Sequence, residues 1–259
     1  MKTNFLKATA LFVLAVSMMS CKSETEKPKD ESMANDSTEV VDEEVYLSKV
    51  VSNSVLTKEE QDKLTPDTVL ADFKAGNERF RTNNITVRNH KEQTRKSAEG
   101  QFPKAFVLSC VDSRVPVEDV FDQGIGDVFV GRVAGNFVNE DMLGSMEFAC
   151  KVAGAKLILV MAHQHCGAIK ATIDDVKLGN ITSLVNRIKP AIGLSANFEG
   201  EKKSSNEAYV KAVAENNVRN TMNTIRKNSP ILKEMEDKGE IKIVGVFYTL
   251  TKAEMIFIE

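Results

Sequence analysis

The sequence lacks the features of several protein classes. No apolar run approaches the roughly 20 residues that cross a bilayer as a helix, which excludes a protein with several membrane-spanning helices. The formal net charge is −3 and basic residues form no block, so no electrostatic footprint for nucleic acid is present. With 14 glycines and 6 prolines among 259 residues, no collagen-like or low-complexity architecture is expected. Four cysteines are too few for a disulfide scaffold of this length.

What remains is an ordinary globular composition with few candidate metal ligands. Hydrophobic residues make up 42% of the chain and charged residues 27%, as in soluble domains. Only 3 histidines accompany the 4 cysteines, so any site built from imidazole and thiolate groups must draw on this short set.

The first 20 residues resemble a targeting segment. After two lysines, an uncharged and largely apolar stretch over residues 8–20 has the length of a signal-peptide core and is too short to span a bilayer. Cys21 follows directly, as in bacterial lipoprotein signals, in which this cysteine becomes the lipidated first residue; Met18 departs from the usual leucine. The alternative is a cleaved secretory signal with an incidental cysteine. In both cases we expect export, and a lipidated chain would face the periplasm or the cell surface.

An acidic tether and a single globular domain are predicted to follow. Residues 21–55 are rich in Asp, Glu, Ser and Thr, and they have too few large apolar residues to offset the entropy lost on ordering. Residues 56–259 have the length of one domain. Capping patterns at Thr57–Glu60 and Thr65-Pro66 predict helix starts.

Strands and helices alternate through the rest of this domain. Short apolar runs predict buried strands, and apolar side chains at helical spacing predict helices between them. The predicted strands are residues 105–109, 127–131, 156–162, 241–247 and 254–258, and the predicted helices are residues 142–153, 168–178, 183–192 and 206–227. Such a pattern is typical of an α/β fold with a mainly parallel central sheet flanked by helices, here with two closing C-terminal strands.

Two of the predicted central strands lead into residues that bind metals. Cys110 follows the first strand, and His163 follows the third, with Cys166 three residues further on. Sites in open α/β sheets gather at the carboxyl ends of the strands, so neighbouring strands would bring these side chains together. Two thiolates and one imidazole form a zinc-binding set that leaves the fourth coordination position to water.

Other interpretations of these residues remain open. Cys150 is a candidate fourth ligand of a closed structural site, although its place on an apolar helix stripe favours a core role. His165 is a candidate replacement for His163, but coordination together with the adjacent Cys166 would be strained. A disulfide between Cys110 and Cys166 is the competing prediction for an exported protein.

The segment after Cys110 adds a candidate ion pair. Asp112 and Arg114 lie within four residues of the thiolate and can form a bidentate pair beside an open coordination position. The simpler explanation is that Asp112 or Ser113 only caps a following helix.

Together these motifs resemble those of the β-class carbonic anhydrases. The most specific motifs are Cys110-x-Asp112-Ser113-Arg114 and His163-x-x-Cys166-Gly167-Ala168, and supporting segments lie at residues 76–80, 126–130 and 132–136. The likeness spans residues 64–259, which is nearly the whole predicted domain.

The resemblance implies a zinc-dependent, reversible hydration of CO2 to bicarbonate and a proton, with zinc-bound hydroxide as the nucleophile. It implies that Cys110, His163 and Cys166 hold one zinc ion per subunit. Asp112 and Arg114 would form the dyad that orients the hydroxide, and whether Asp112 itself binds zinc at low pH is left open.

The resemblance also implies a substrate pocket and an oligomer. Gln101, Phe129, Phe148 and Gly167 fall at pocket positions, and Phe148 lacks the hydroxyl of the tyrosine found in many members. The family forms homodimers or higher homo-oligomers with active sites at the subunit interface. Two rival functions remain, namely hydrolysis of carbon disulfide or carbonyl sulfide by the same zinc chemistry, and a non-catalytic zinc-binding lipoprotein.

Overall fold

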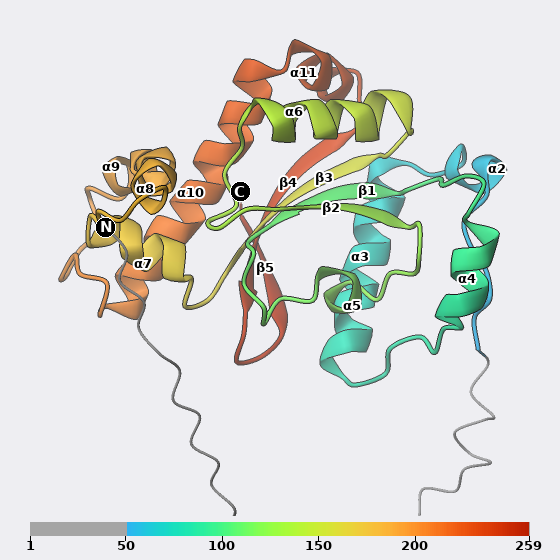
Figure 1. Ribbon diagram of the computed structural model, residues 1–259, viewed down its shortest axis with the longest axis horizontal. Coiled ribbons are helices and arrows are strands. Elements are labelled where there is room, and N and C mark those ends of the chain that lie inside the picture. The colour runs from blue at the N-terminus through green and yellow to red at the C-terminus, as the bar shows by residue number, and fades with distance from the viewer. Residues whose placement is uncertain (1–50, 259) are drawn as a thin grey trace, which may run out of the picture. The chain divides into compact units, whose positions relative to one another are not determined.

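A five-stranded sheet forms the centre of the computed structural model, which describes residues 51–258 (Figure 1). The strands are β1 (Ala105–Ser109), β2 (Val128–Arg132), β3 (Leu157–His163), β4 (Lys242–Thr249) and β5 (Glu254–Ile258). Their order in the sheet is β2-β1-β3-β4-β5, and every neighbouring pair is parallel except β4 and β5. The prediction of a mainly parallel α/β sheet with closing C-terminal strands is confirmed.

Helices cover both faces of this sheet. They are α2 (Lys58–Gln61), α3 (Pro66–Arg81), α4 (His90–Lys96), α5 (Val117–Val120), α6 (Glu140–Glu147), the π-helix η1 (Phe148–Val152), α7 (Gly167–Ile173), α8 (Ile181–Ile188), α9 (Pro190–Leu194), α10 (Glu207–Asn228) and α11 (Pro230–Asp237). The helix expected over residues 142–153 continues from α6 into η1, and the helix expected over residues 183–192 is divided at Pro190. The sequence analysis missed α4 because its mostly polar side chains show no apolar periodicity.

Both predicted capping sites start helices. The side-chain oxygens of Thr57 and Thr65 each accept a hydrogen bond from the backbone N–H three residues further on. The backbone N–H of each threonine donates in return to the side chain of that same residue. Ser52 forms a parallel bridge with Arg88, so paired backbone begins before the predicted domain start at residue 56. The predicted signal peptide, Cys21 and most of the predicted tether lie outside the described residues. Within residues 51–258, no helix combines the length and apolarity that crossing a bilayer requires.

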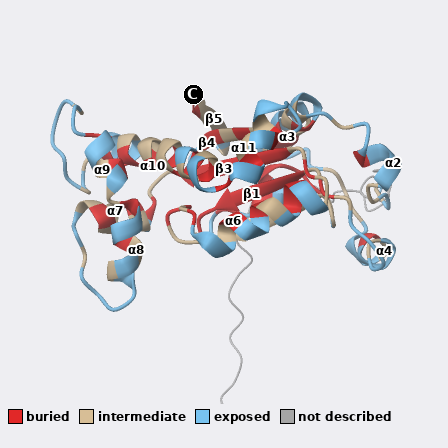
Figure 2. Cartoon of the chain, turned by 90° about the horizontal axis from the view of Figure 1, so that it is seen from above, coloured by how far each residue is buried: buried red, intermediate tan, exposed pale blue. Residues whose placement is uncertain are grey.

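The sheet is buried between two apolar layers (Figure 2). Alternate side chains of β1 point to opposite faces of the sheet. Phe106 and Leu108 pack into the layer that includes α6, α7 and α10, and Val107 packs into the layer that includes α3 and α5. In the strand order, β2 lies next to β1 towards one edge of the sheet, and β3 lies next to β1 on its other flank, so the chain returns past β1 between β2 and β3. The carboxyl ends of β1 and β3 therefore border a topological switch point, where open α/β sheets form their sites.

A buried carboxylate joins the N-terminal part of the domain to this sheet. The Asp122 side chain is fully buried, pairs with Arg79 and accepts a hydrogen bond from Arg88 Nη1 at 2.5 Å. The backbone N–H and the hydroxyl of Thr86 also donate to it, at 3.0 and 2.8 Å. Burial raises the pKa of the Asp122 carboxyl, but the hydrogen bonds from the two arginines and Thr86 outweigh it and leave the pKa below its usual value.

Candidate metal centre

Cys110, His163 and Cys166 converge at the carboxyl edge of the sheet. Cys110 directly follows β1, His163 is the last residue of β3, and Cys166 is the residue before the first turn of α7. All three are buried, and their ligand atoms lie within 4.8 Å of one another. In the part of the chain that the structure describes, no other group of His, Cys, Asp and Glu side chains has this geometry.

The two sulfur atoms are spaced for a shared metal ion. The sulfurs of Cys110 and Cys166 lie 4.0 Å apart, and both thiols are free, so the alternative disulfide is not formed. Two Zn–S bonds of about 2.3 Å at a tetrahedral angle would place the sulfurs about 3.8 Å apart. The observed spacing therefore fits zinc.

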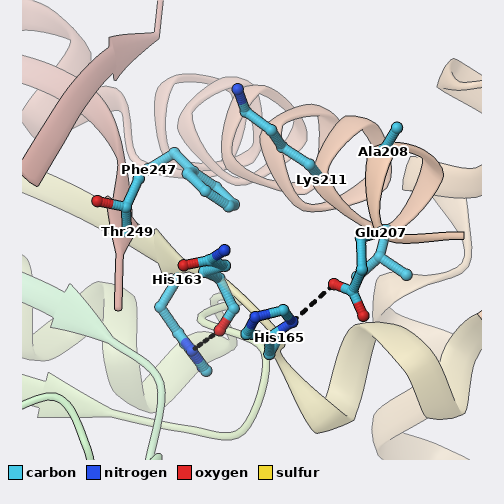
Figure 3. A pocket seen from close by; sticks show the side chains of 9 residues that line it. His163, His165, Glu207, Ala208, Lys211, Phe247 and Thr249 are labelled. Atoms are coloured by element: carbon cyan, nitrogen blue, oxygen red, sulfur yellow. Dashed lines mark hydrogen bonds and ion pairs between the residues drawn. The ribbon is translucent and has the colours of Figure 1, made fainter. Parts of the chain in front are cut away.

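His163 is oriented as a ligand by its own backbone. Its Nδ1 lies 2.9 Å from the carbonyl oxygen of Gln164, so Nδ1 carries the hydrogen and donates it, and Nε2 holds the lone pair (Figure 3). This Nε2 atom is buried and has no hydrogen-bond partner among residues 51–258. A buried polar atom without a partner is costly, and a metal ion beside the two thiols would satisfy it.

The other two candidate ligands point elsewhere. His165 turns towards α10, where its Nδ1 lies 2.7 Å from a carboxylate oxygen of Glu207 at the rim of a cavity of about 290 Å³ (Figure 3). Cys150 lies in η1 within the apolar core, where burial raises the pKa of its thiol to about 12. Neither residue belongs to the ligand cluster, so Cys150 does not complete a closed site.

Asp112 and Arg114 form the predicted ion pair at the edge of the cluster. Arg114 donates from Nε and Nη2 to the two carboxylate oxygens of Asp112, at 2.9 and 2.8 Å. These hydrogen bonds hold the pKa of Asp112 well below its usual range. Oδ2 of Asp112 lies 3.7 Å from Nε2 of His163. The helix-cap alternative does not apply, because the next helix, α5, begins after Pro116.

Arg132, the last residue of β2, and Gly135 in the loop that follows hold the Cys110 segment in place. The Arg132 side chain donates to the backbone carbonyls of Cys110 and Asp112, at 2.8 and 2.6 Å. The buried N–H of Gly135 donates to the sulfur of Cys110 at 3.4 Å. Residues 132–136 belong to one of the motifs in the sequence, but the motif alone indicates no role for them. The available signal was the position of Arg132 directly after the strand predicted over residues 127–131.

A hydrogen bond between the sulfurs of Cys110 and Cys166 shifts the pKa values of the two thiols in opposite directions. A hydrogen bond from the Cys166 thiol lowers the pKa of Cys110, and the same bond, together with burial, raises the pKa of Cys166. Cys110 is therefore the thiol that loses its proton more readily, and Cys166 is the one that retains it.

Zinc binding near pH 7 is expected to release about one proton per ion, because both sulfurs must be thiolates in the complex and only Cys166 has a proton to lose. Isothermal titration calorimetry in two buffers with different ionisation enthalpies measures this number. A release close to two protons beyond any that comes from metal-bound water would mean that both thiols are protonated in the metal-free protein, contrary to this expectation.

The residues predicted to line the substrate pocket do not all lie near the ligand cluster of the same chain. Gly167 directly follows Cys166, and the rings of Phe129 and Phe148 lie 6.2 Å apart in an edge contact, with Phe148 52% exposed. Gln101 is exposed and precedes β1, so a strand about 16 Å long separates it from Cys110. Within a single chain, the structure brings Gly167 to the cluster but leaves Gln101 at the opposite edge of the sheet.

Comparisons with known proteins agree on one family. A profile of the family described as carbonic anhydrase matches residues 105–255. "Carbonic anhydrase 2" of Mycobacterium tuberculosis is 34% identical over 184 residues, which cover 69% of this chain and 86% of that protein. A solved Coccomyxa β-carbonic anhydrase in complex with acetazolamide has a TM-score of 0.57 and 26% identity, covering 65% of this chain and 78% of that one. A tetrameric β-carbonic anhydrase of Sordaria macrospora shares the fold, with a TM-score of 0.58, 22% identity and coverage of 74% and 95%.

Proposed function

The chain belongs to the β-class carbonic anhydrase family, and from this premise we propose that it catalyses the reversible hydration of CO2 to bicarbonate and a proton. Cys110, His163 and Cys166 would hold one zinc ion. The observation that carries this proposal is the unpaired Nε2 of buried His163 beside two free, buried thiols. When bound, zinc would supply a Lewis acid that lowers the pKa of water and so provides a nucleophile near neutral pH.

Asp112 orients the attacking oxygen in this mechanism. As a carboxylate it can only accept hydrogen bonds, so a hydrogen on the attacking oxygen points to Asp112 and a lone pair is left to face CO2. Arg114 occupies both carboxylate oxygens and so keeps Asp112 from turning into the ligand cluster 3.7 Å away. The two thiolates already balance the formal charge of the metal, so orientation by this pair contributes more than at a site with three neutral ligands.

Replacing Arg114 by alanine is expected to lower kcat/KM for CO2 hydration by about 10- to 100-fold, because Asp112 is then free to bind the metal and close the open position. Stopped-flow assays on the zinc-loaded variant measure the loss. Arg95 is a matched control, because it forms a similar bidentate ion pair with Glu92 in α4. Arg95→Ala should leave the rate of CO2 hydration unchanged. Near-normal hydration by Arg114→Ala would contradict the assigned role.

A CO2 hydration assay on the zinc-loaded mature chain tests the proposed function. Activity should disappear on treatment with a chelator and return with zinc, at one ion per chain. The same preparation is also assayed with carbon disulfide and carbonyl sulfide. A zinc-loaded chain that hydrates no CO2, or that turns over only the sulfur compounds, would overturn the proposal.

We propose that the active form is a homodimer or a higher homo-oligomer in which a second copy brings Gln101, Phe129 and Phe148 to the pocket. Two exposed apolar side chains support this proposal: Val111 beside the cluster is 55% exposed, and Phe148 is 52% exposed. A solved relative with this fold is a tetramer. Analytical ultracentrifugation of the active protein checks this, and a fully active monomer would contradict it.

We also propose that the mature chain is exported and anchored by a lipid on Cys21, facing the periplasm or the cell surface. The support is the order of the N-terminal sequence, in which an apolar stretch leads into a single cysteine and an acidic segment. Cys21→Ser should move the protein from the membrane fraction to a soluble or unprocessed form, as measured by cell fractionation and immunoblotting. Unchanged membrane recovery of a processed chain would contradict lipidation at this residue.

A further inference from the structure

Asn217 is a buried polar residue on an otherwise apolar helix face. It lies in the middle of α10, between Val213 and Val218, which pack into the core, and its side chain is fully buried. Its Nδ2 donates to the carbonyl oxygen of Gly135 at 2.7 Å, while its Oδ1 has no partner among residues 51–258. Burial of an amide oxygen without a hydrogen-bond partner lowers the stability of the fold. The hydrogen bond that the Asn217 side chain does make is therefore of interest.

The partner of Asn217 is the residue that contacts the Cys110 sulfur. Gly135 donates its N–H to Cys110 at 3.4 Å and accepts from Asn217 through its C=O, so both of its backbone polar groups are engaged. Its φ of +80° favours glycine, and a Cβ at this position would meet the Ile188 side chain at 2.4 Å. Gly135 therefore packs closely against α8, and its carbonyl oxygen accepts a hydrogen bond from Asn217 in α10.

The N–H of Gly135 matters to a metal centre because it withdraws charge from a sulfur ligand. Two thiolates donate strongly to zinc, and a hydrogen bond to one of them reduces that donation and leaves the metal a stronger Lewis acid. On this basis, and resting on the proposed zinc site, we propose that Asn217 is a positioning residue that sets the electron donation of Cys110 through Gly135. The hydrogen bond of the Asn217 side chain is to Gly135 and not to Cys110, His163 or Cys166.

A neighbour of Asn217 provides a matched control. Thr221 lies one turn further along α10, is also buried, and donates through its hydroxyl to the carbonyl of Asn136 at 3.3 Å. Its contact therefore holds the next residue of the same loop, which does not touch the sulfur. Thr221→Val removes one buried hydrogen bond at almost constant volume and leaves the Asn217–Gly135 hydrogen bond intact. Asn217→Leu keeps the number of side-chain heavy atoms and removes the Asn217–Gly135 hydrogen bond.

The test uses the mature chain loaded with Co²⁺ in place of zinc. In Asn217→Leu, the sulfur-to-cobalt charge-transfer band should move to longer wavelength, because the Cys110 thiolate becomes more electron-rich. The amide proton of Gly135 should exchange with solvent at least about tenfold faster than in the wild type, since its hydrogen bond opens more often. Thr221→Val should change neither the band nor the exchange of Gly135.

A second variant covers the case in which Asn217→Leu does not fold. Asn217→Ala removes the Nδ2 donor to the Gly135 carbonyl and adds no bulk, so the same band shift is expected. An unchanged band and unchanged Gly135 exchange in the folded variant would overturn the inference, as would equal changes in Thr221→Val. Both readouts are independent of CO2 turnover, so a chain that binds Co²⁺ without hydrating CO2 would refute the proposed function and still test this inference.

Discussion

Replacing Cys166 by alanine is expected to remove zinc from the protein and CO2 hydration with it. The change deletes one of three ligands and leaves the buried Cys110 and His163 to hold the ion alone. Structural zinc sites with four ligands bind with about 10–16 kcal/mol, so one ligand contributes roughly 3 kcal/mol, or more than about 100-fold in Kd. Zinc content after dialysis and a chelator competition assay measure the loss.

Cys150 provides the control for this experiment. It is also a buried cysteine, at 3% exposure, but it lies in η1 outside the ligand cluster. Cys150→Ala should therefore keep one zinc per chain and a normal rate of CO2 hydration. Retention of zinc with unchanged affinity by Cys166→Ala, or loss of zinc from Cys150→Ala, would refute the assignment of the ligands.

Replacing Asp122 by alanine is expected to lower the free energy of unfolding by about 3–5 kcal/mol, because removal of one partner from a buried ion pair leaves uncompensated charge. In this protein the charges left behind are those of Arg79 and Arg88, and Thr86 loses the acceptor of its N–H and hydroxyl. Urea unfolding at pH 7 measures the change. An unfolding midpoint equal to that of the wild type would contradict the role of this network.

The contribution of Asp122 to the free energy of unfolding should also decrease as the pH falls. Its pKa is below the usual value in the folded protein, so its stabilisation is fully present above about pH 4 and is lost as the pH falls through the folded pKa. The difference between the wild type and Asp122→Ala should therefore shrink in acid. Asp175, an exposed aspartate paired with Lys177 and Lys189, is the control, because its backbone has the same φ of 50° as that of Asp122. Asp175→Ala should lower the free energy of unfolding by only a small fraction of the loss expected for Asp122→Ala.

The ligand cluster could be predicted from the sequence because its parts are fixed by local pattern and by a general rule of topology. Cys110 and His163 each stand at the carboxyl end of an apolar run, and parallel strands bring such ends to one edge of the sheet. The choice of His163 over His165 rested on spacing, and the structure agrees, because His165 turns away to Glu207.

The contacts that support the cluster could not be predicted because they join residues that are far apart along the chain. Asp122 accepts hydrogen bonds from residues 79–88, a segment in which charged and polar side chains show no periodicity. Arg132 contacts the Cys110 backbone, and Asn217 contacts Gly135, only after the sheet and α10 have packed. For Asn217, the signal was a polar residue on the apolar stripe of the predicted helix over residues 206–227.

The three ligands come from two distant parts of the chain, one directly after β1 and the others at the end of β3 and before α7, and this separation affects how long the fold survives. Cys110 and Cys166 are 56 positions apart in the chain, so an ion bound to both acts as a removable cross-link that closes a long loop. Such a cross-link reduces the conformational freedom of the unfolded chain and slows the local opening that proteases need. The persistence of this protein against proteolysis should therefore follow the supply of zinc in its surroundings.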